Sequence, residues 1–285
     1  MKVAIAVLSA LAVVLTVAPA PAVAAELQDP SDTYALFWTI GDHPLRDGDF
    51  WVKEQEQIVD TRLWPVTLYA VESPVSDSSG ALLIPAGTQL VGLRANRLVA
   101  CTQIKAAEGT AKGKRVCLAD IDGDGAPDHA FTRGLGGLDW IALQGRFSDT
   151  KMVAIGAAKL RELRPKEMSG APYISFHYQR ILDGGLTIPL TQEGGHRVRF
   201  HFKVGRDADE RRVWVVRDCA DTRPPSFCTS ANFPSRMAIA GLDLDLLERR
   251  GEDIRMRMAA PFHGQQVRFQ NTSYSYYTQL TMFAE

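Results

Sequence analysis

The sequence lacks the residue spacings that mark several common enzyme classes. Its six histidines form no HxH, HExxH or HxxxH pattern, no GxSxG elbow is present, and no pair among the four cysteines has CxxC spacing. The glycine-rich segment from Arg133 to Leu138 lacks GxGxxG spacing, which argues against a nucleotide-binding loop. The sequence therefore predicts no catalytic and no cofactor-binding residue.

Neither sign of charge dominates, and long apolar runs are missing beyond the first 25 residues. The chain carries 32 Lys and Arg against 33 Asp and Glu, for a formal net charge of −1. This balance excludes wholesale attraction to nucleic acid or to anionic membrane. No later apolar run approaches the roughly 20 residues that cross a bilayer. We therefore expect no nucleic-acid partner and no transmembrane segment in the mature chain.

The N-terminus has the three parts of a secretory leader. Met1-Lys2 precedes an apolar run from Val3 to Val17, and small residues follow at 22–25. Cleavage after Ala24 and cleavage after Ala25 fit equally well. Residues 1–25 are thus predicted to be a signal peptide of bacterial style, and the mature protein is expected to be periplasmic or secreted.

An acidic motif at residues 120–128, DIDGDGAPD, is the most informative stretch. Hard Ca²⁺ takes six to eight oxygen ligands, and this loop offers carboxylates at positions 1, 3, 5 and 9 and a carbonyl at position 7. Aspartate and glycine also favour a solvated turn, which is the alternative. Four alternating carboxylates repel one another without a cation. The predicted metal ligands are Asp120, Asp122, Asp124, the Ala126 carbonyl and Asp128.

These nine residues resemble EF-hand-like calcium loops. Asp120, Asp122 and Asp124 match the three leading side-chain ligands, and Asp128 stands at the ninth position. At the twelfth position, where an EF-hand places a bidentate Glu, this chain has Phe131. The motif is therefore more similar to the DxDxDGxxD loops of thrombospondin type 3 repeats and integrin-type propeller blades. The resemblance implies one structural Ca²⁺ and covers no other part of the chain.

Four cysteines in an exported chain predict two disulfides, with three formal pairings. We favour Cys101 with Cys117 and Cys219 with Cys228. Cys101 ends one apolar, strand-like run, and Cys117 lies on another that leads directly into the acidic loop. The first bridge is expected to fix one end of that loop and to contribute about 3 kcal/mol to stability.

Alternating apolar and polar residues predict a mainly β fold, an antiparallel sandwich or barrel-like structure with one or two short helices. In His196–Val204 the apolar residues alternate with residues expected in solvent. Glu54–Arg62 and Lys151–Leu163 have helix-compatible composition. Residues 26–150 form a β-rich region with the disulfide and calcium loop, and residues 151–285 form a second β-rich region, as two domains or as one.

Several polar residues outside the acidic loop are interpreted as structural. His177 lies on an aromatic strand and is expected to be a packed residue. His196 and His201 are five apart on a strand, hence on opposite faces, so they share no ligand set. Asp243 and Asp245 are expected on the solvent face of one strand.

Residues 83–92, LIPAGTQLVG, resemble the IPxGTxLxG segment of outer-membrane core subunits of conjugation and type IV secretion machines. A turn at Pro85–Gly87 between two strands explains this segment as well.

The sequence predicts an exported, calcium-stabilised, non-enzymatic envelope or binding protein, with an envelope protein or a glycan as its partner. One alternative is a secreted hydrolase acting on a glycan or another polymer. The other is an accessory component of a secretion or conjugation assembly.

Overall fold

The chain folds almost entirely into β-strands. The computed structural model describes residues 32–103, 114–134, 140–182, 197–206, 209–215, 233–273 and 278–284. These residues contain 22 strands and the short 3-10 helix η2 (Pro165–Glu167), which confirms the mainly β class. Within them, no helix is long and apolar enough to cross a membrane. The expected leader and the expected Cys219–Cys228 bridge lie outside the described residues.

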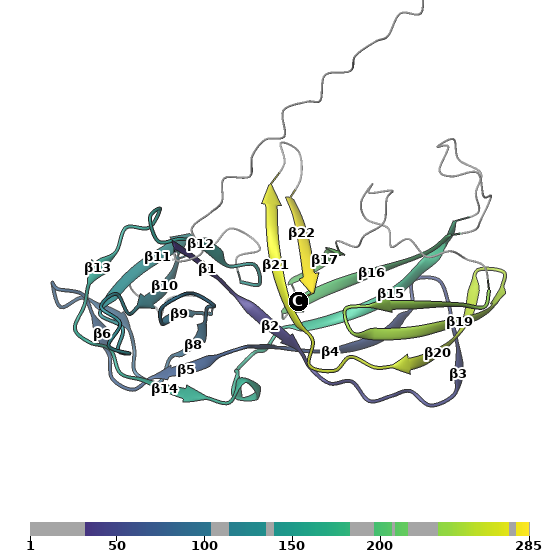
Figure 1. The fold of residues 1–285 in the computed structure, drawn as a ribbon, viewed down its shortest axis with the longest axis horizontal. Helices are drawn as coiled ribbons and strands as arrows, with labels where there is room; N and C mark the ends of the chain where they lie inside the picture. Colours follow the sequence, from purple (N-terminus) through teal and green to yellow (C-terminus); the bar gives the residue numbers. More distant parts are fainter. Residues whose placement is uncertain are drawn as a thin grey trace, which may run out of the picture.

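One half of the molecule is built on an antiparallel, seven-stranded sheet (left in Figure 1). Its strands, in spatial order, are β13 (Val153–Ala154), β11 (His129–Gly134), β10 (Lys114–Ala119), β9 (Val99–Thr102), β8 (Gln89–Gly92), β5 (Leu68–Val71) and β14 (Leu160–Leu163). Two short ribbons accompany it: β1 (Thr33–Ala35) with β12 (Gln144–Arg146), and β6 (Val75–Ser76) with β7 (Leu82–Ile84).

The other half is a closed barrel with a four-stranded sheet beside it (right in Figure 1). The barrel order is β15 (Tyr173–Leu182), β16 (Arg197–Arg206), β17 (Asp209–Val215), β22 (Thr278–Ala284), β21 (Gln266–Ser273), β2 (Phe37–Ile40) and β4 (Gln57–Pro65). The four-stranded sheet runs β18 (Ser235–Ile239), β19 (Leu242–Arg250), β20 (Asp253–Ala260) and β3 (Asp49–Val52). The N-terminal strands β2, β3 and β4 thus lie among C-terminal strands.

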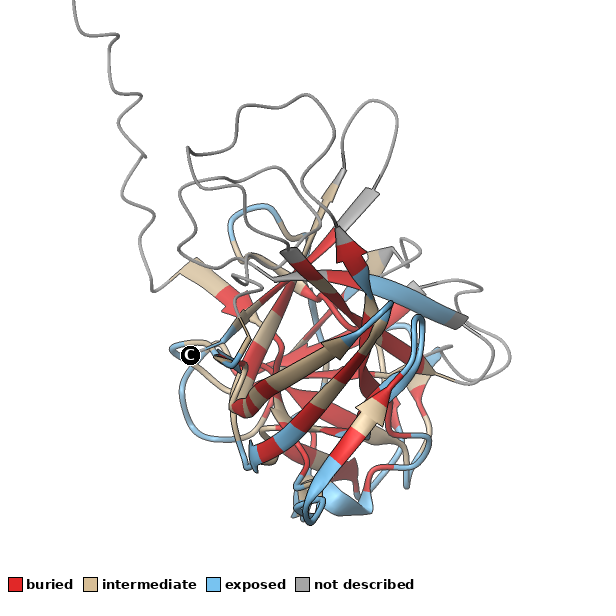
Figure 2. Cartoon of the chain, turned by 90° about the vertical axis from the view of Figure 1, so that its right-hand side faces the viewer, coloured by how far each residue is buried: buried red, intermediate tan, exposed pale blue. Residues whose placement is uncertain are grey.

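A single cluster of buried side chains runs from the seven-stranded sheet into the barrel and the four-stranded sheet. Buried and more exposed residues alternate along many strands (Figure 2). The predicted core face of β16 is confirmed, because Val198, Phe200, Phe202 and Val204 are fully buried. The expectation that its other face is solvated is wrong at His201, whose exposed fraction is 4%.

Two segments expected to be helical are strands instead. Most of Glu54–Arg62 belongs to β4, which pairs with β2 and β15 in the barrel. The segment Lys151–Leu163 contains β13, paired with β11, and β14, paired with β5. Helix propensity differs by only tenths of a kcal/mol between most residues, so pairing with neighbouring strands overrides it.

The Cys101–Cys117 disulfide is confirmed and buried. The two residues face each other across β9 and β10, with their Cα atoms 4.0 Å apart. Cys117 precedes Ala119, the last residue of β10, and the acidic loop follows directly. The bridge therefore pins the strand that carries the start of the loop.

Removing this bridge should destabilise the protein substantially. We expect Cys101→Ala/Cys117→Ala to lower the free energy of unfolding by about 3 kcal/mol, because the bridge restricts the unfolded chain over 16 residues. Urea denaturation of the wild type and the variant gives this difference. An unchanged midpoint and slope would show that the bridge contributes nothing to stability.

Candidate functional site

The acidic loop joins β10 to β11 and is held at both ends by main-chain hydrogen bonds. Ala119 and His129 form the last residue pair of this hairpin. The Asp120 N–H donates to the Leu98 carbonyl (3.0 Å), and the Asp128 N–H donates to the Ala119 carbonyl (3.1 Å). The intervening residues are thereby confined to a closed loop at the end of a hairpin.

Asp120 organises the loop from a buried position, with an exposed fraction of 3%. Its Oδ1 accepts the Gly123 N–H (2.7 Å), and its Oδ2 accepts the Gly125 N–H (2.8 Å). Both glycines have positive φ angles, 80° and 90°, which residues with a Cβ adopt at a cost. These two glycines allow the chain to fold around the Asp120 carboxylate.

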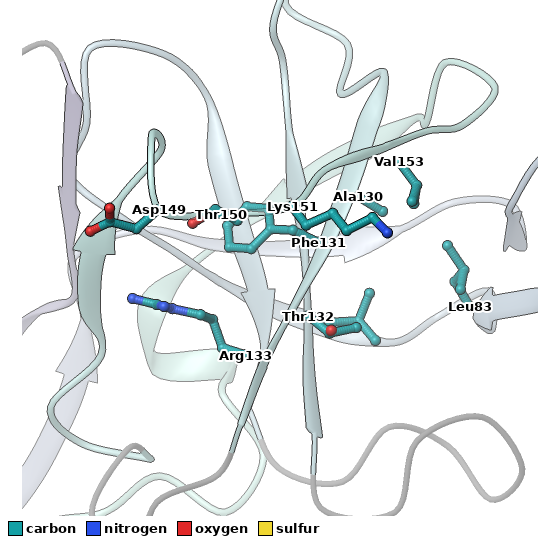
Figure 3. A pocket seen from close by; sticks show the side chains of 10 residues that line it. Leu83, Ala130, Phe131, Thr132, Arg133, Asp149, Thr150, Lys151 and Val153 are labelled. Carbon is teal, nitrogen blue, oxygen red and sulfur yellow. The ribbon is translucent and has the colours of Figure 1, made fainter.

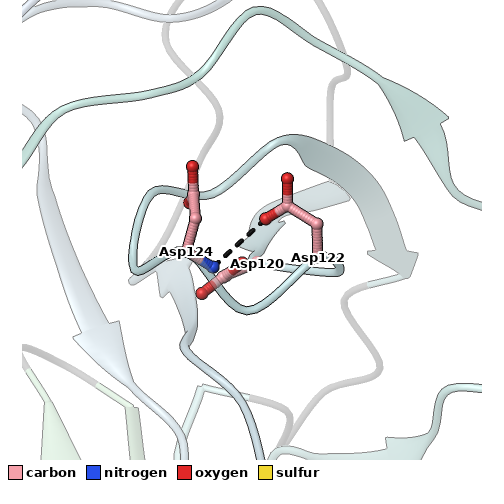
Figure 4. A group of neighbouring side chains, drawn as sticks. All are labelled: Asp120, Asp122 and Asp124. Carbon is pink, nitrogen blue, oxygen red and sulfur yellow. Dashed lines mark hydrogen bonds between the residues drawn. The ribbon is translucent and has the colours of Figure 1, made fainter.

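Asp122 and Asp124 complete a group of three carboxylates (Figure 4). The Asp124 N–H donates to Asp122 Oδ1 (3.2 Å), and the Ala126 N–H donates to Asp124 Oδ1 (2.8 Å). One oxygen from each of the three aspartates lies within 4.8 Å of the other two. Oxygens bound to one cation at about 2.3–2.6 Å are at most about 5 Å apart. The three aspartates could therefore hold a metal ion.

Asp128 stands apart from this group of three. Its Oδ1 accepts the Ile121 N–H (2.8 Å) and lies 3.0 Å from His129 Nδ1. The His129 ring and the Ile121 N–H lower the pKa of Asp128. In this arrangement Asp128 closes the loop as a hydrogen-bond acceptor.

The charges in the loop raise the pKa of Asp122 above its ordinary value. The hydrogen bond from the Asp124 N–H favours the charged form, but desolvation and the carboxylates of Asp124 and Asp128 outweigh it. A cation placed among these oxygens would relieve the repulsion.

The loop is also tied to the chain that follows β13. The Ile155 N–H donates to the Asp128 carbonyl (2.8 Å), and the Ala158 N–H donates to the Pro127 carbonyl (2.7 Å). His129 and Ala154 are paired residues of β11 and β13. A change in the shape of the loop would therefore be transmitted to the edge of the seven-stranded sheet.

A pocket of about 240 Å³ lies on the same sheet, further along β11 (Figure 3). Arg133 is one wall residue, and its Nη2 donates to the Gln144 carbonyl (3.0 Å). The described residues that line the pocket include one carboxylate and no histidine; they are Leu83, Val116, Ala130, Phe131, Thr132, Arg133, Asp149, Thr150, Lys151 and Val153.

A second polar cluster, which the sequence did not predict, lies on the barrel. His177 of β15 is paired with His201 of β16, and their rings stack with centroids 5.0 Å apart and planes 7° apart. Ser175 Oγ lies 2.9 Å from His177 Nε2. The alternation pattern placed His201 on the solvent face of its strand, and His177 was expected to be a packed residue. Their pairing depends on the β15–β16 register, which no local motif specifies.

Both histidines are uncharged near neutral pH. Burial lowers the pKa of His201 to about 4, with further contributions from Arg212, His177 and Lys203. Burial and Lys203 also lower the pKa of His177, while Glu210 opposes this change. Below the ordinary histidine pKa, unfolding therefore takes up protons, and acid favours the unfolded state.

We expect the free energy of unfolding to fall as the pH drops from about 6.5 to about 5, at up to about 1.4 kcal/mol per pH unit for each histidine. Urea denaturation across this range measures the slope. His201→Leu should flatten it, whereas His263→Gln, at an exposed histidine, should leave it unchanged. A wild-type slope of zero, or an equal slope in His201→Leu, would contradict this assignment.

Comparison of the chain with protein-family models, curated proteins and solved structures gives no match. The Asp120, Asp122 and Asp124 cluster therefore stands on its own geometry as the candidate metal centre.

Proposed function

We propose that this protein is an exported, non-enzymatic envelope or binding protein whose acidic loop holds one structural Ca²⁺. The observation that carries the metal assignment is the convergence of Asp120, Asp122 and Asp124 around a turn with two positive-φ glycines. All three offer oxygen, the ligand of hard cations, and zinc sites usually contain nitrogen or sulfur. Irregularly spaced oxygens also suit Ca²⁺ better than Mg²⁺, which demands near-octahedral geometry.

The proposed ion would lie between elements of the fold that are fixed on both sides of the loop, which supports a structural role. The disulfide holds β10 to β9 on one side of the loop, and residues 155–158 are bonded to its other side. Asp122 and Asp124 are exposed, so an ion can enter without unfolding the sheet. The ion would then set the distance between β10, β11 and β13.

Binding is favoured over hydrolysis by the lining of the β11 pocket. Acid–base hydrolysis generally uses two carboxylates or a histidine with a carboxylate, and the described lining provides Asp149 alone. Ser148 and Lys151 have SxxK spacing, but Ser148 Oγ donates to Asp32 Oδ2 (2.5 Å) and both residues lie on a loop. A small site with apolar and cationic walls suits a ligand better than a bond-breaking step.

Export accounts for the buried disulfide. Disulfides persist in oxidising compartments and are rare in the cytosol. The bridge is compatible with the periplasmic or secreted location that the leader-like residues 1–25 predict.

Calcium should stabilise the oxidised mature protein against heat. A ligand that binds only the folded state, present at about 100 times its Kd, adds about 2.7 kcal/mol to stability. We expect a higher Tm in excess Ca²⁺ than in EDTA, and a smaller increase with equal Mg²⁺. Differential scanning calorimetry measures both.

Matched variants locate the effect. Asp122→Ala/Asp124→Ala should lose the calcium-dependent rise in Tm, while Asp42→Ala/Asp47→Ala, which removes two exposed carboxylates elsewhere, should keep it. The metal assignment fails if Ca²⁺ leaves the wild-type Tm unchanged or if the loop variant responds as the wild type does.

A further inference from the structure

The outer face of the barrel carries a row of basic residues around the stacked histidines. Along β16, Arg199, His201 and Lys203 alternate with the buried phenylalanines. The strand register places further residues opposite them. The His201 face is defined by its members on four adjacent strands: Asp60 of β4, Ser175, His177 and Arg180 of β15, Arg199, His201 and Lys203 of β16, and Glu210 and Arg212 of β17.

This face carries four cationic side chains, on Arg180, Arg199, Lys203 and Arg212, against two carboxylates, on Asp60 and Glu210. Arg180 and Arg199 are directly paired across β15 and β16, an arrangement of like charges that destabilises a sheet. Lys203 has a counter-ion, because its Nζ lies 2.9 Å from Glu210 Oε2. Among the described residues, no carboxylate forms an ion pair with Arg180, Arg199 or Arg212.

Three nitrogen atoms on this face are buried and lack hydrogen-bond partners among the described residues. They are both ring nitrogens of His201 and Nε of Arg199. Leaving such an atom unpaired costs about 1–3 kcal/mol, so folded proteins nearly always supply a partner. His201 and Arg199 are two residues apart on one face of β16, so a single ligand could supply the missing partners for both.

The ligand that fits these groups is an anion with several oxygens. The guanidinium offers donors only, and a neutral imidazole offers one donor. A metal cation does not fit this face. The two imidazole rings are parallel, so their lone pairs do not converge on one ion, and the surrounding arginines repel positive charge. A tetrahedral oxyanion offers four acceptors and balances charge, and arginine binds such groups in forked geometry.

We propose that the His201 face binds an oxyanion of the phosphate or sulfate class, with His201 and Arg199 at its centre and Arg180 and Arg212 at its rim. Arg180 and Arg212 are exposed whereas the nitrogens of His201 and Arg199 Nε are buried, so the anion reaches the centre when the side chains at the rim move aside. The oxyanion is either a free ion or a group carried by an anionic polymer. This site lies on the barrel, whereas the acidic loop lies on the seven-stranded sheet, so the proposal does not depend on calcium binding.

Inorganic phosphate is the first probe, titrated by calorimetry at pH 7 and constant ionic strength in the presence of EDTA. We expect saturable binding at one site. Charge-assisted hydrogen bonds are about twice as strong as neutral ones, so Arg199→Gln and His201→Leu should each weaken binding about tenfold or more. Arg161→Gln, which removes an exposed arginine on β14, should bind as the wild type does.

The stability of the same variants separates binding from a structural role. Without phosphate, Arg199→Gln and His201→Leu should have a Tm equal to or above that of the wild type, because each removes an unpaired buried nitrogen. The proposal is overturned if phosphate and sulfate do not bind the wild type, or if the two variants bind as tightly as the wild type. It is equally overturned if binding is lost only together with a large fall in Tm.

Polyphosphate distinguishes the two sources of the anion. If the polymer binds at least about tenfold more tightly than phosphate, counted per phosphate group, the face takes a polymer-borne oxyanion. Equal affinity per group indicates a free ion. In both cases Arg199→Gln must weaken binding about tenfold or more, and polymer binding at wild-type affinity in this variant contradicts the assignment to the His201 face.

Discussion

The mutual repulsion of three aspartates constrains the loop that joins β10 to β11 in the seven-stranded sheet. The loop brings one oxygen of each within 4.8 Å of the others and raises the pKa of Asp122. Main-chain N–H groups of Gly123 and Gly125 offset part of this repulsion at Asp120, but Asp122 and Asp124 each accept only one main-chain N–H among the described residues. A divalent cation bound here would remove the remainder of the repulsion and give this hairpin end a definite shape.

The barrel carries an excess of positive charge, opposite in sign to that of the acidic loop. Its outer face at His201 concentrates arginines and buried nitrogens that have no hydrogen-bond partner among the described residues, where the acidic loop concentrates oxygens. One core cluster extends through both halves, so each charged cluster rests on strands that are packed firmly from behind. The acidic loop and the His201 face thus carry excess charge of opposite sign on one continuous core.

The sequence predicted features that depend on contiguous residues, and it did not predict those that depend on strand register. The acidic loop was found because its carboxylates and its turn glycines lie within nine residues. The buried face of β16 was found because alternation is local. The His177–His201 stack joins residues that only the β15–β16 register brings together.

The helix expected at Glu54–Arg62 was wrong because β4 gains its partners from β2 and β15, far along the chain.

The most direct test of the metal centre is equilibrium dialysis with radioactive Ca²⁺ at physiological salt concentration. We predict one bound Ca²⁺ per chain, lost when Asp120→Asn removes the charge that organises the loop and retained when Asp77→Asn alters an aspartate in the turn between β6 and β7. Retention of Ca²⁺ by the Asp120 variant, or no bound Ca²⁺ in the wild type, would contradict it.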